Sequence, residues 1–164
     1  MPDSSLIMYE EESRQINAEL TKLHQQTNAQ VTFLVDKNGQ LIASVGETKN
    51  LDTTSMASLT AGNIAATGGM AKLLGEKEFS ILFHEGEKDN IHISLIGQRV
   101  ILVVIFDQRS SLGLVRLRVK KSAEIFTQIF ERLAQKTETA KTNKLDSKSP
   151  FAEITEEDIE KLFG

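Results

Sequence analysis

Three histidines are the first candidates for catalysis or metal binding in this sequence: His24, His84 and His92. They are widely separated, and His84-Glu85 lacks the second histidine that would complete a zinc-protease helix. The chain contains no cysteine, so it has no thiol nucleophile. These residues predict no metal site, and we expect no cofactor.

The glycine-rich stretch from Gly62 to Gly69 is the next candidate, because glycine-rich loops can cradle phosphates. The stretch lacks the spacing and the Lys-Ser/Thr ending of a phosphate loop, and it falls within a helical pattern. No serine occupies a nucleophile elbow. We therefore assign no catalytic residue and expect no enzyme, although a triad assembled in space leaves no local mark in a sequence.

The composition describes a chain of 164 residues, with room for one domain and a short appendage. A net charge of -4 argues against a dedicated nucleic-acid binder, which normally presents a basic surface. Tyr9 is the only tyrosine and tryptophan is absent, so we interpret the phenylalanines as core residues and not as a base-stacking platform. No apolar run is long enough to span a bilayer, and Met1 to Ser5 lacks the start of a secretory signal. We expect a cytoplasmic protein.

The elements that position these residues follow from the spacing of apolar side chains. Residues 10–27 predict a helix, because Ile16, Leu20 and Leu23 recur at helical spacing behind three glutamates. Asn38-Gly39 suits a tight turn with positive φ between two strands. The expected strands are residues 31–35, 41–43, 79–83, 91–95 and 100–106. The fourth alternates as a half-buried strand does, and the last is apolar throughout, as in a central strand covered on both faces.

Residues 52–74 predict a second helix that is unusually rich in alanine and glycine, with Thr53 or Thr54 as N-cap and Gly75 as the stop. Each of two adjacent glycines costs a helix about 1 kcal/mol relative to alanine, so some contact should compensate. Two interpretations stay open: the small residues admit a neighbouring helix or partner, or they pack closely on the protein's own sheet. The row that would make the contact is Ala57, Ala61, Ala65, Gly68, Gly69 and Lys72.

The last third of the chain is less regular. Residues 112–121 alternate like a strand, whereas the following apolar residues have helical spacing up to Gln135. Residues 136–149 have the polar composition of a flexible linker, and residues 150–164 predict a short amphipathic helix that needs a docking surface. Its apolar residues are Phe151, Ile154, Ile159, Leu162 and Phe163.

Four stretches carry a family resemblance that covers roughly Met8 to Leu133: VTFLVDKNGQLIAS, DTTSMASLTAGNIAATGGMAKLLGE, FHEGEKDNI and VVIFDQRSSLGLVRLRVKK. With the order α-β-β-α-β-β-β-α they resemble the bacterial, polarity-associated branch of the Roadblock/dynein-light-chain family. The resemblance implies an α/β, profilin-like sandwich over residues 1–135, with a five-stranded, mainly antiparallel sheet and helices on both faces. It also assigns residues 112–121 to the start of the third helix.

The same resemblance implies a homodimer in which the second helices pack together and the third strands join two sheets. Such dimers bind the GTP form of a small Ras-like GTPase of the MglA type, which carries its own GTP and Mg²⁺, and stimulate hydrolysis by repositioning the GTPase's own catalytic groups. The expected setting is bacterial cell polarity or motility, with enrichment at a cell pole and other polarity proteins as further partners. The candidate electrostatic contacts are Arg109, Arg116, Arg118 and Lys120.

Two other functions stay open on the sequence. One is a passive adaptor of the same fold, which would hold a GTPase or a polarity complex without activating it. The other is a small enzyme or ligand sensor, which would need a polar pocket. The tail at 150–164 resembles an extension found on some family members, and its partner could be the GTPase, its own dimer or a third protein.

Overall fold

The computed structural model describes residues 8–146, and it describes side chains as far as residue 140. The chain divides into two compact units, Glu10–Ile129 and the combination of Met1–Tyr9 with Phe130–Gly164. All five strands and the first two helices belong to the larger unit. None of the described helices is long and apolar enough to cross a membrane.

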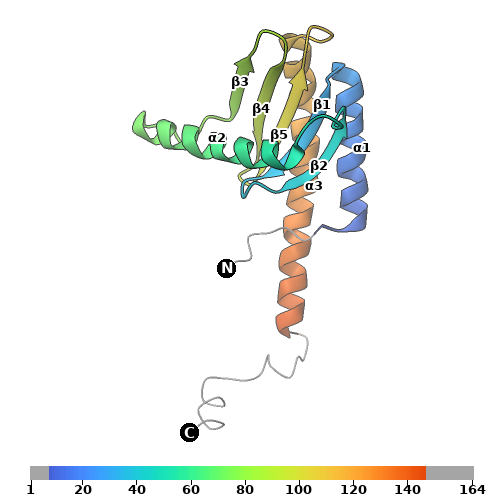
Figure 1. Cartoon of the computed structure of the whole chain (residues 1–164). Coiled ribbons are helices and arrows are strands. Elements are labelled where there is room, and N and C mark those ends of the chain that lie inside the picture. The colour runs from blue at the N-terminus through green and yellow to red at the C-terminus, as the bar shows by residue number, and fades with distance from the viewer. Residues whose placement is uncertain (1–7, 147–164) are drawn as a thin grey trace. The chain divides into compact units, whose positions relative to one another are not determined.

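The larger unit is built on one antiparallel sheet with the order β2-β1-β5-β4-β3 (Figure 1). Its strands are β1 (Val31–Asp36), β2 (Leu41–Gly46), β3 (Ile81–Glu85), β4 (Asn90–Ile96) and β5 (Val100–Phe106). Every residue of β5 is buried, as expected for the central strand. The hairpin turn after β1 places Gly39 at a φ of 92°, which confirms the predicted left-handed turn position.

Helices cover both faces of this sheet (Figure 1). α2 (Thr53–Leu73) crosses one face, while α1 (Glu10–Thr27) and the first part of α3 (Leu112–Asp146) lie on the other. Beneath α2, Ala57 and Ile64 share a core with Phe33 and alternate residues of β4 and β5. The Roadblock order of elements and the two-faced sandwich are therefore confirmed.

The cover on the second face corrects one expectation about β4. The alternation in its sequence predicted a half-buried strand with polar residues facing water. In the structure both His92 and Ser94 are buried, with exposures of 1% and 4%. The alternating residues of β4 therefore face two different helical layers, because α2 packs over one face of the sheet and α3 over the other. Neither face of β4 is exposed to solvent as the alternation suggested.

The ends of α2 show which local signals were correct. Asp52, not Thr53 or Thr54, is the N-cap: its carboxylate accepts hydrogen bonds from the backbone N–H and the hydroxyl of Ser55. This arrangement holds the pKa of Asp52 below its usual value, first through the Ser55 hydroxyl. At the other end Gly75 has a φ of 79°, and its N–H donates to the Lys72 carbonyl while that of Glu76 donates to the Ala71 carbonyl. This glycine stop was predicted.

Two boundaries differ from those that the sequence predicts. The third strand begins at Ile81 and not at Phe79, since the residues after Gly75 first form an irregular segment beside α2. α3 runs to Asp146, beyond the end predicted at Gln135, so residues 136–146 of the predicted flexible linker are helical. The polar residues after Gln135 include good helix formers such as Lys, Glu and Ala, which continue a helix without large apolar side chains. The predicted segment 150–164 lies outside the described residues.

Candidate protein-interaction surface

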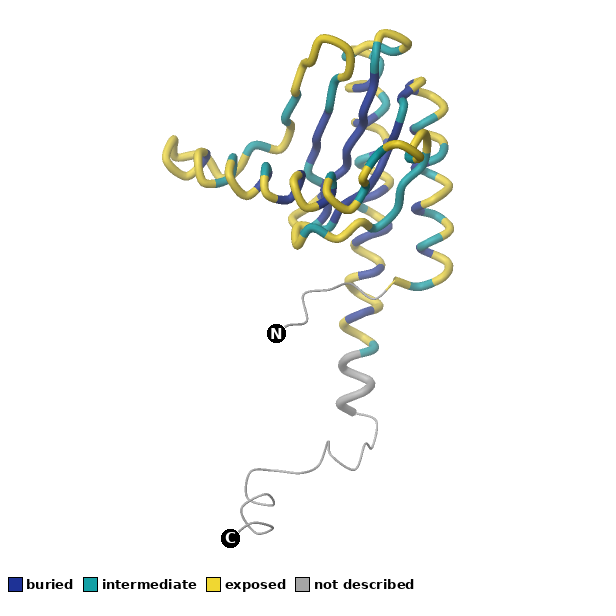
Figure 2. The backbone as a smooth tube through the Cα atoms, viewed as in Figure 1, coloured by how far each residue is buried: buried dark blue, intermediate teal, exposed yellow. Residues whose placement is uncertain are grey.

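The outward side of α2 is apolar although it faces solvent. Leu59, Met70 and Leu73 are 69%, 58% and 88% exposed, and Leu74 at the helix end is 71% exposed. The second half of the helix runs out beyond the edge strand β3 (Figure 1), and most of it is exposed (Figure 2). A surface helix normally turns polar residues to water, so a helix that is apolar on both sides indicates a second packing partner.

The glycines of α2 are not required by the packing of their own protomer. Apart from its chain neighbours and the nearby backbone of α2 itself, a Cβ atom added at Gly62, Gly68 or Gly69 would meet no described atom within 4 Å. The hypothesis that these small residues allow close packing on the protein's own sheet therefore has no support at these three positions. Of the remaining small residues in the predicted row, Ala57 and Ala61 are buried, whereas Ala65 is exposed.

A groove of about 320 Å³, here called the α2 groove, lies beside this half of the helix. It is lined by Lys37, Ala61, Ile64, Ala65, Gly68, Gly69, Lys72, Lys77, Glu78, Phe79 and Leu95. Lys37 pairs with Glu78, with 3.8 Å between the ammonium nitrogen and the carboxylate oxygen. Neither Lys72 nor Lys77 has an ion-pair partner in the described part of the chain. The groove thus combines apolar lining residues with two lysines that have no ion-pair partner in the described part of the chain.

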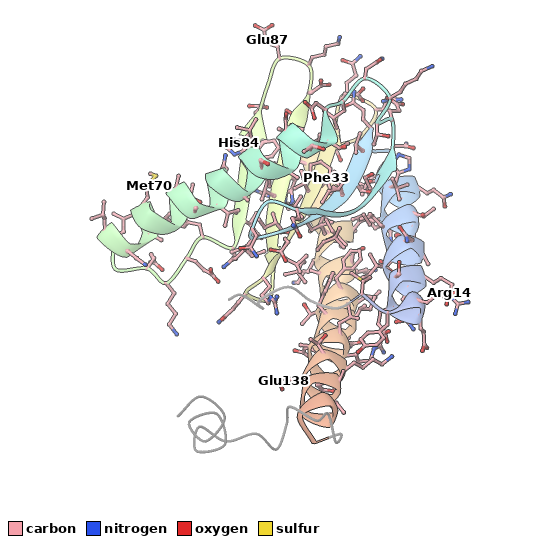
Figure 3. The ribbon with its side chains drawn as sticks, turned by 60° about the horizontal axis from the view of Figure 1, so that its bottom comes forward. Arg14, Phe33, Met70, His84, Glu87 and Glu138 are labelled. Carbon is pink, nitrogen blue, oxygen red and sulfur yellow. The ribbon has the colours of Figure 1, made fainter. Side chains whose placement is uncertain are left out.

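The edge strand β3 continues the exposed surface. It is hydrogen-bonded to β4 alone among the described strands, and Ile81 on it is 55% exposed. The His84 ring on β3 approaches α2, where its Nε2 lies 3.4 Å from the side-chain amide nitrogen of Asn63 (Figure 3). An unpaired strand edge presents backbone donors and acceptors to a further strand.

Arg109 is held by carboxylates at one end of the sheet. Its Nε donates to both carboxylate oxygens of Asp107, at 3.1 and 3.2 Å, and its Nη1 lies 3.3 Å from a Glu47 oxygen. The hydrogen bond from the Arg109 side chain is the largest cause that lowers the pKa of Asp107. Arg109 is therefore part of a local ion-pair cluster, although half of its side chain remains exposed.

The other predicted basic contacts lie on α3. Arg116 and Lys120 are exposed and Arg118 is partly buried. The buried His92 lies near Arg116, and neither of its ring nitrogens has a hydrogen-bond partner among the described residues. Burial first, and the Arg116 charge second, lower the pKa of His92 to about 4. The ring is therefore neutral at neutral pH.

Of the predicted row, the α2 groove brings together every residue except Ala57: Ala61, Ala65, Gly68, Gly69 and Lys72. Arg109 and the basic residues of α3 do not line the groove. The predicted tail residues from Phe151 to Phe163 lie outside the described residues. Lys77 and Phe79 were not predicted as part of this surface: Phe79 was assigned to the third strand, and Lys77 follows the glycine stop, where no helical or strand periodicity marks it. No cluster of three or more potential metal ligands occurs among the described residues.

The sheet order and the covering helices define a Roadblock-type sandwich, and the comparison with known families agrees. The Roadblock/LC7 domain family matches residues 16–106, and the chain belongs to this family. It is similar to MglB of Myxococcus xanthus, with 62% identity over 78% of this chain and 96% of that chain, at a TM-score of 0.74.

Two further structures extend the comparison. The gliding protein MglB of Thermus thermophilus is 31% identical over 80% of this chain and 99% of its own, with a TM-score of 0.75. A Roadblock/LC7 domain from Streptomyces avermitilis shares the fold at 13% identity, over 70% of this chain and 96% of its own, with a TM-score of 0.64. No curated protein sequence matches the chain.

Proposed function

We propose that this protein is a homodimeric regulator of a small Ras-like GTPase of the MglA type. It binds the GTP form and stimulates hydrolysis by repositioning the GTPase's own catalytic groups. The observation that carries the proposal is the outward side of α2, where Leu59, Met70 and Leu73 are exposed beside glycines that their own protomer leaves open. Similarity to MglB makes a GTPase the partner to test.

In this proposal the protein self-associates through α2 and through the adjoining free edge of β3. α2 from each copy packs through its small residues, and the free edges of the β3 strands join. One related structure is described as MglB in a tetrameric arrangement, which supports an oligomer. A dimer of this kind leaves part of the paired helices for the GTPase.

The hydrolytic step is assigned to the GTPase. Arg109 is the candidate for a trans-acting arginine, and its guanidinium is already paired with Asp107 and Glu47. A finger must leave its own protein's carboxylates to reach the phosphates. The pairing supports stimulation without an arginine finger, in a cytoplasmic setting of cell polarity or motility; one relative is named a gliding protein.

Binding is tested by calorimetry with the MglA-type GTPase of the same cell, loaded either with a non-hydrolysable GTP analogue or with GDP. We expect at least tenfold tighter binding to the GTP form. Equal affinity for both forms, or no binding, would contradict a nucleotide-selective regulator. A GTP-selective complex without faster hydrolysis would instead identify the passive adaptor.

A further inference from the structure

The first part of α3 is strongly basic, although the chain as a whole has a net charge of -4. Residues 114–121 read LVRLRVKK and contain no carboxylate. Arg116, Lys120 and Lys121 are exposed, and none of them has an ion-pair partner in the described part of the chain. Positive charge concentrated at one place on an acidic protein selects partners at that place.

Apolar side chains lie between these cations. Leu117 is 52% exposed, and Leu114, Lys120 and Lys121 are its neighbours one turn away on the helix surface. Ile125, which is 37% exposed, follows one turn after Lys121. These five residues are here called the α3 ridge. One exposed leucine needs no partner, but apolar residues interleaved with cations along one side of a helix offer a contact surface for an amphipathic segment.

Two neighbouring side chains show that the described part of the chain does not neutralise the α3 ridge. Glu124 is exposed one turn after Lys120 and Lys121, and it forms an ion pair with neither. Arg118 is partly buried, and its Nε has no hydrogen-bond acceptor among the described residues. Withdrawing part of a guanidinium from water without an acceptor costs free energy, which a carboxylate from another molecule would offset.

The α3 ridge lies apart from both features proposed for self-association. α3 and α2 cover opposite faces of the sheet (Figure 1), and no ridge residue lines the α2 groove or belongs to β3. All ridge residues fall within the larger compact unit. A partner on the ridge therefore does not compete with a second copy of the chain on α2.

We propose that the α3 ridge binds an acidic, amphipathic segment of another protein. Apolar side chains of the segment pack on Leu117 and Ile125, while its carboxylates pair with Lys120 and Lys121. Opposite charge fixes the orientation of the segment, and burial of apolar surface supplies affinity. The chain then joins different partners through opposite faces of its sheet, which goes beyond the regulation of a GTPase.

An anionic bilayer is the other common source of negative charge. It presents that charge over a flat area much wider than one helix. A chain of net charge -4 is repelled by such an area as a whole, whereas a short acidic segment meets only the α3 ridge. The distribution of charge therefore favours a polypeptide.

Fluorescence anisotropy of the full-length protein with two labelled synthetic peptides tests the proposal. One peptide alternates pairs of glutamate with pairs of leucine, and the other has serine in place of every leucine at the same charge. We expect micromolar binding of the leucine peptide and at least tenfold weaker binding of the serine peptide. No binding of the leucine peptide, or equal affinity for the two peptides, would overturn the proposal.

Substitutions on the ridge locate the binding site. Lys120→Glu combined with Lys121→Glu should weaken binding of the leucine peptide at least tenfold, and Leu117→Ser should remove most of the preference for leucine over serine. The matched control, Lys22→Glu combined with Lys49→Glu, reverses two exposed lysines outside α3 and should change affinity less than twofold. Equal losses in the two double variants would overturn the ridge as the site. Circular dichroism checks that the variants fold.

Co-sedimentation with phosphatidylserine vesicles tests the bilayer as the occupant. We expect no more binding than to neutral vesicles. Vesicle binding that Lys120→Glu combined with Lys121→Glu abolishes would assign the ridge to a membrane and overturn the proposal. None of these measurements contains a GTPase, so their outcome is independent of the proposed function.

Discussion

Arg109 is the predicted candidate for an arginine that acts in trans on the GTPase. An arginine supplied in trans raises the rate about 10³ to 10⁵-fold. Because Arg109 is engaged by Asp107 and Glu47, we expect Arg109→Ala to lower stimulated hydrolysis less than tenfold. Single-turnover rates at saturating protein measure this change, with Arg14→Ala on α1 as the control arginine. A loss of a hundredfold or more, with binding retained, would identify Arg109 as a finger.

His92 makes stability depend on pH in a defined direction. An unfolded histidine has a pKa of about 6.5, and burial together with Arg116 lowers the folded value to about 4. Above pH 6.5 the ring is neutral in both states and has no effect. As pH falls from 6.5 to 4, only the unfolded state gains the proton, so the folded state loses up to about 3 kcal/mol.

Urea unfolding at pH 7.5, 5.5 and 4.5 measures this loss, and His92→Leu is the comparison because it removes the titrating ring. The difference in unfolding free energy between wild type and variant should shift against the wild type as the pH falls. A parallel pH dependence of the two proteins would show that His92 does not titrate in this way. An NMR titration of the His92 ring in the wild type provides the same answer if the variant folds poorly.

His92 also shows what the sequence leaves undetermined about single residues. Its alternation with Ile91 and Ile93 predicted the strand correctly. The same pattern fits a polar residue in water and a polar residue under a second layer, so burial depended on where α3 lies. The position of Arg116 near the ring depends on the same packing, so the spacing of residues in the sequence does not predict it.

Among the structural elements, glycine occupies a strained backbone position at the end of β2 and an unobstructed position in α2. Substituting each glycine by alanine distinguishes the two situations. Gly46 ends β2 with a φ of 119°, and a Cβ there would collide with the Gln30 carbonyl and the His24 ring. Gly62 in α2 has open space around it. We expect Gly46→Ala to lower the unfolding free energy by about 1–3 kcal/mol. Gly62→Ala should raise it by about 0.5–1 kcal/mol.

Denaturant titration of the two variants checks the pair. Destabilisation by Gly62→Ala of similar size to that by Gly46→Ala would show that α2 has packing contacts at this position that the protomer does not reveal. Such a result would favour a partner that touches Gly62 itself.

The exposed half of α2 provides the test of self-association. Gly68→Arg places a long charged side chain where nothing in the protomer obstructs it, so the fold should persist. A second backbone packed against this position would be pushed away, and dimer affinity should fall at least tenfold. Light scattering across a micromolar dilution series measures the change. A wild-type protein that is monomeric at these concentrations would contradict the dimer.

The elements were predictable to different degrees for physical reasons. β5 was recognised because seven consecutive apolar residues leave few alternatives to a central strand. The start of α3 was ambiguous because Arg116, Arg118 and Lys120 alternate with apolar residues, and the family resemblance settled it. The end of α3 was placed too early because its polar residues carry helix propensity without an apolar stripe.

For the whole molecule, the candidate surface is only partly encoded in local pattern. The small residues of α2 pointed to a close neighbour, but their sequence did not distinguish the protein's own sheet from a partner. That distinction came from the open space around Gly68 and Gly69 and from the exposure of Met70 and Leu73. The α2 groove joins a helix, a turn and strand β4, so no single stretch contains it.

Single-turnover GTP hydrolysis by the MglA-type GTPase of the same cell measures whether this protein activates its proposed partner. The GTPase is loaded with GTP and followed with no addition, with the wild-type protein, and with Gly68→Arg at matched concentration. We predict at least tenfold faster hydrolysis with the wild type and a return toward the intrinsic rate with the variant. An unchanged rate at concentrations that saturate binding would contradict GTPase activation and identify a scaffold that binds the GTPase without activating it.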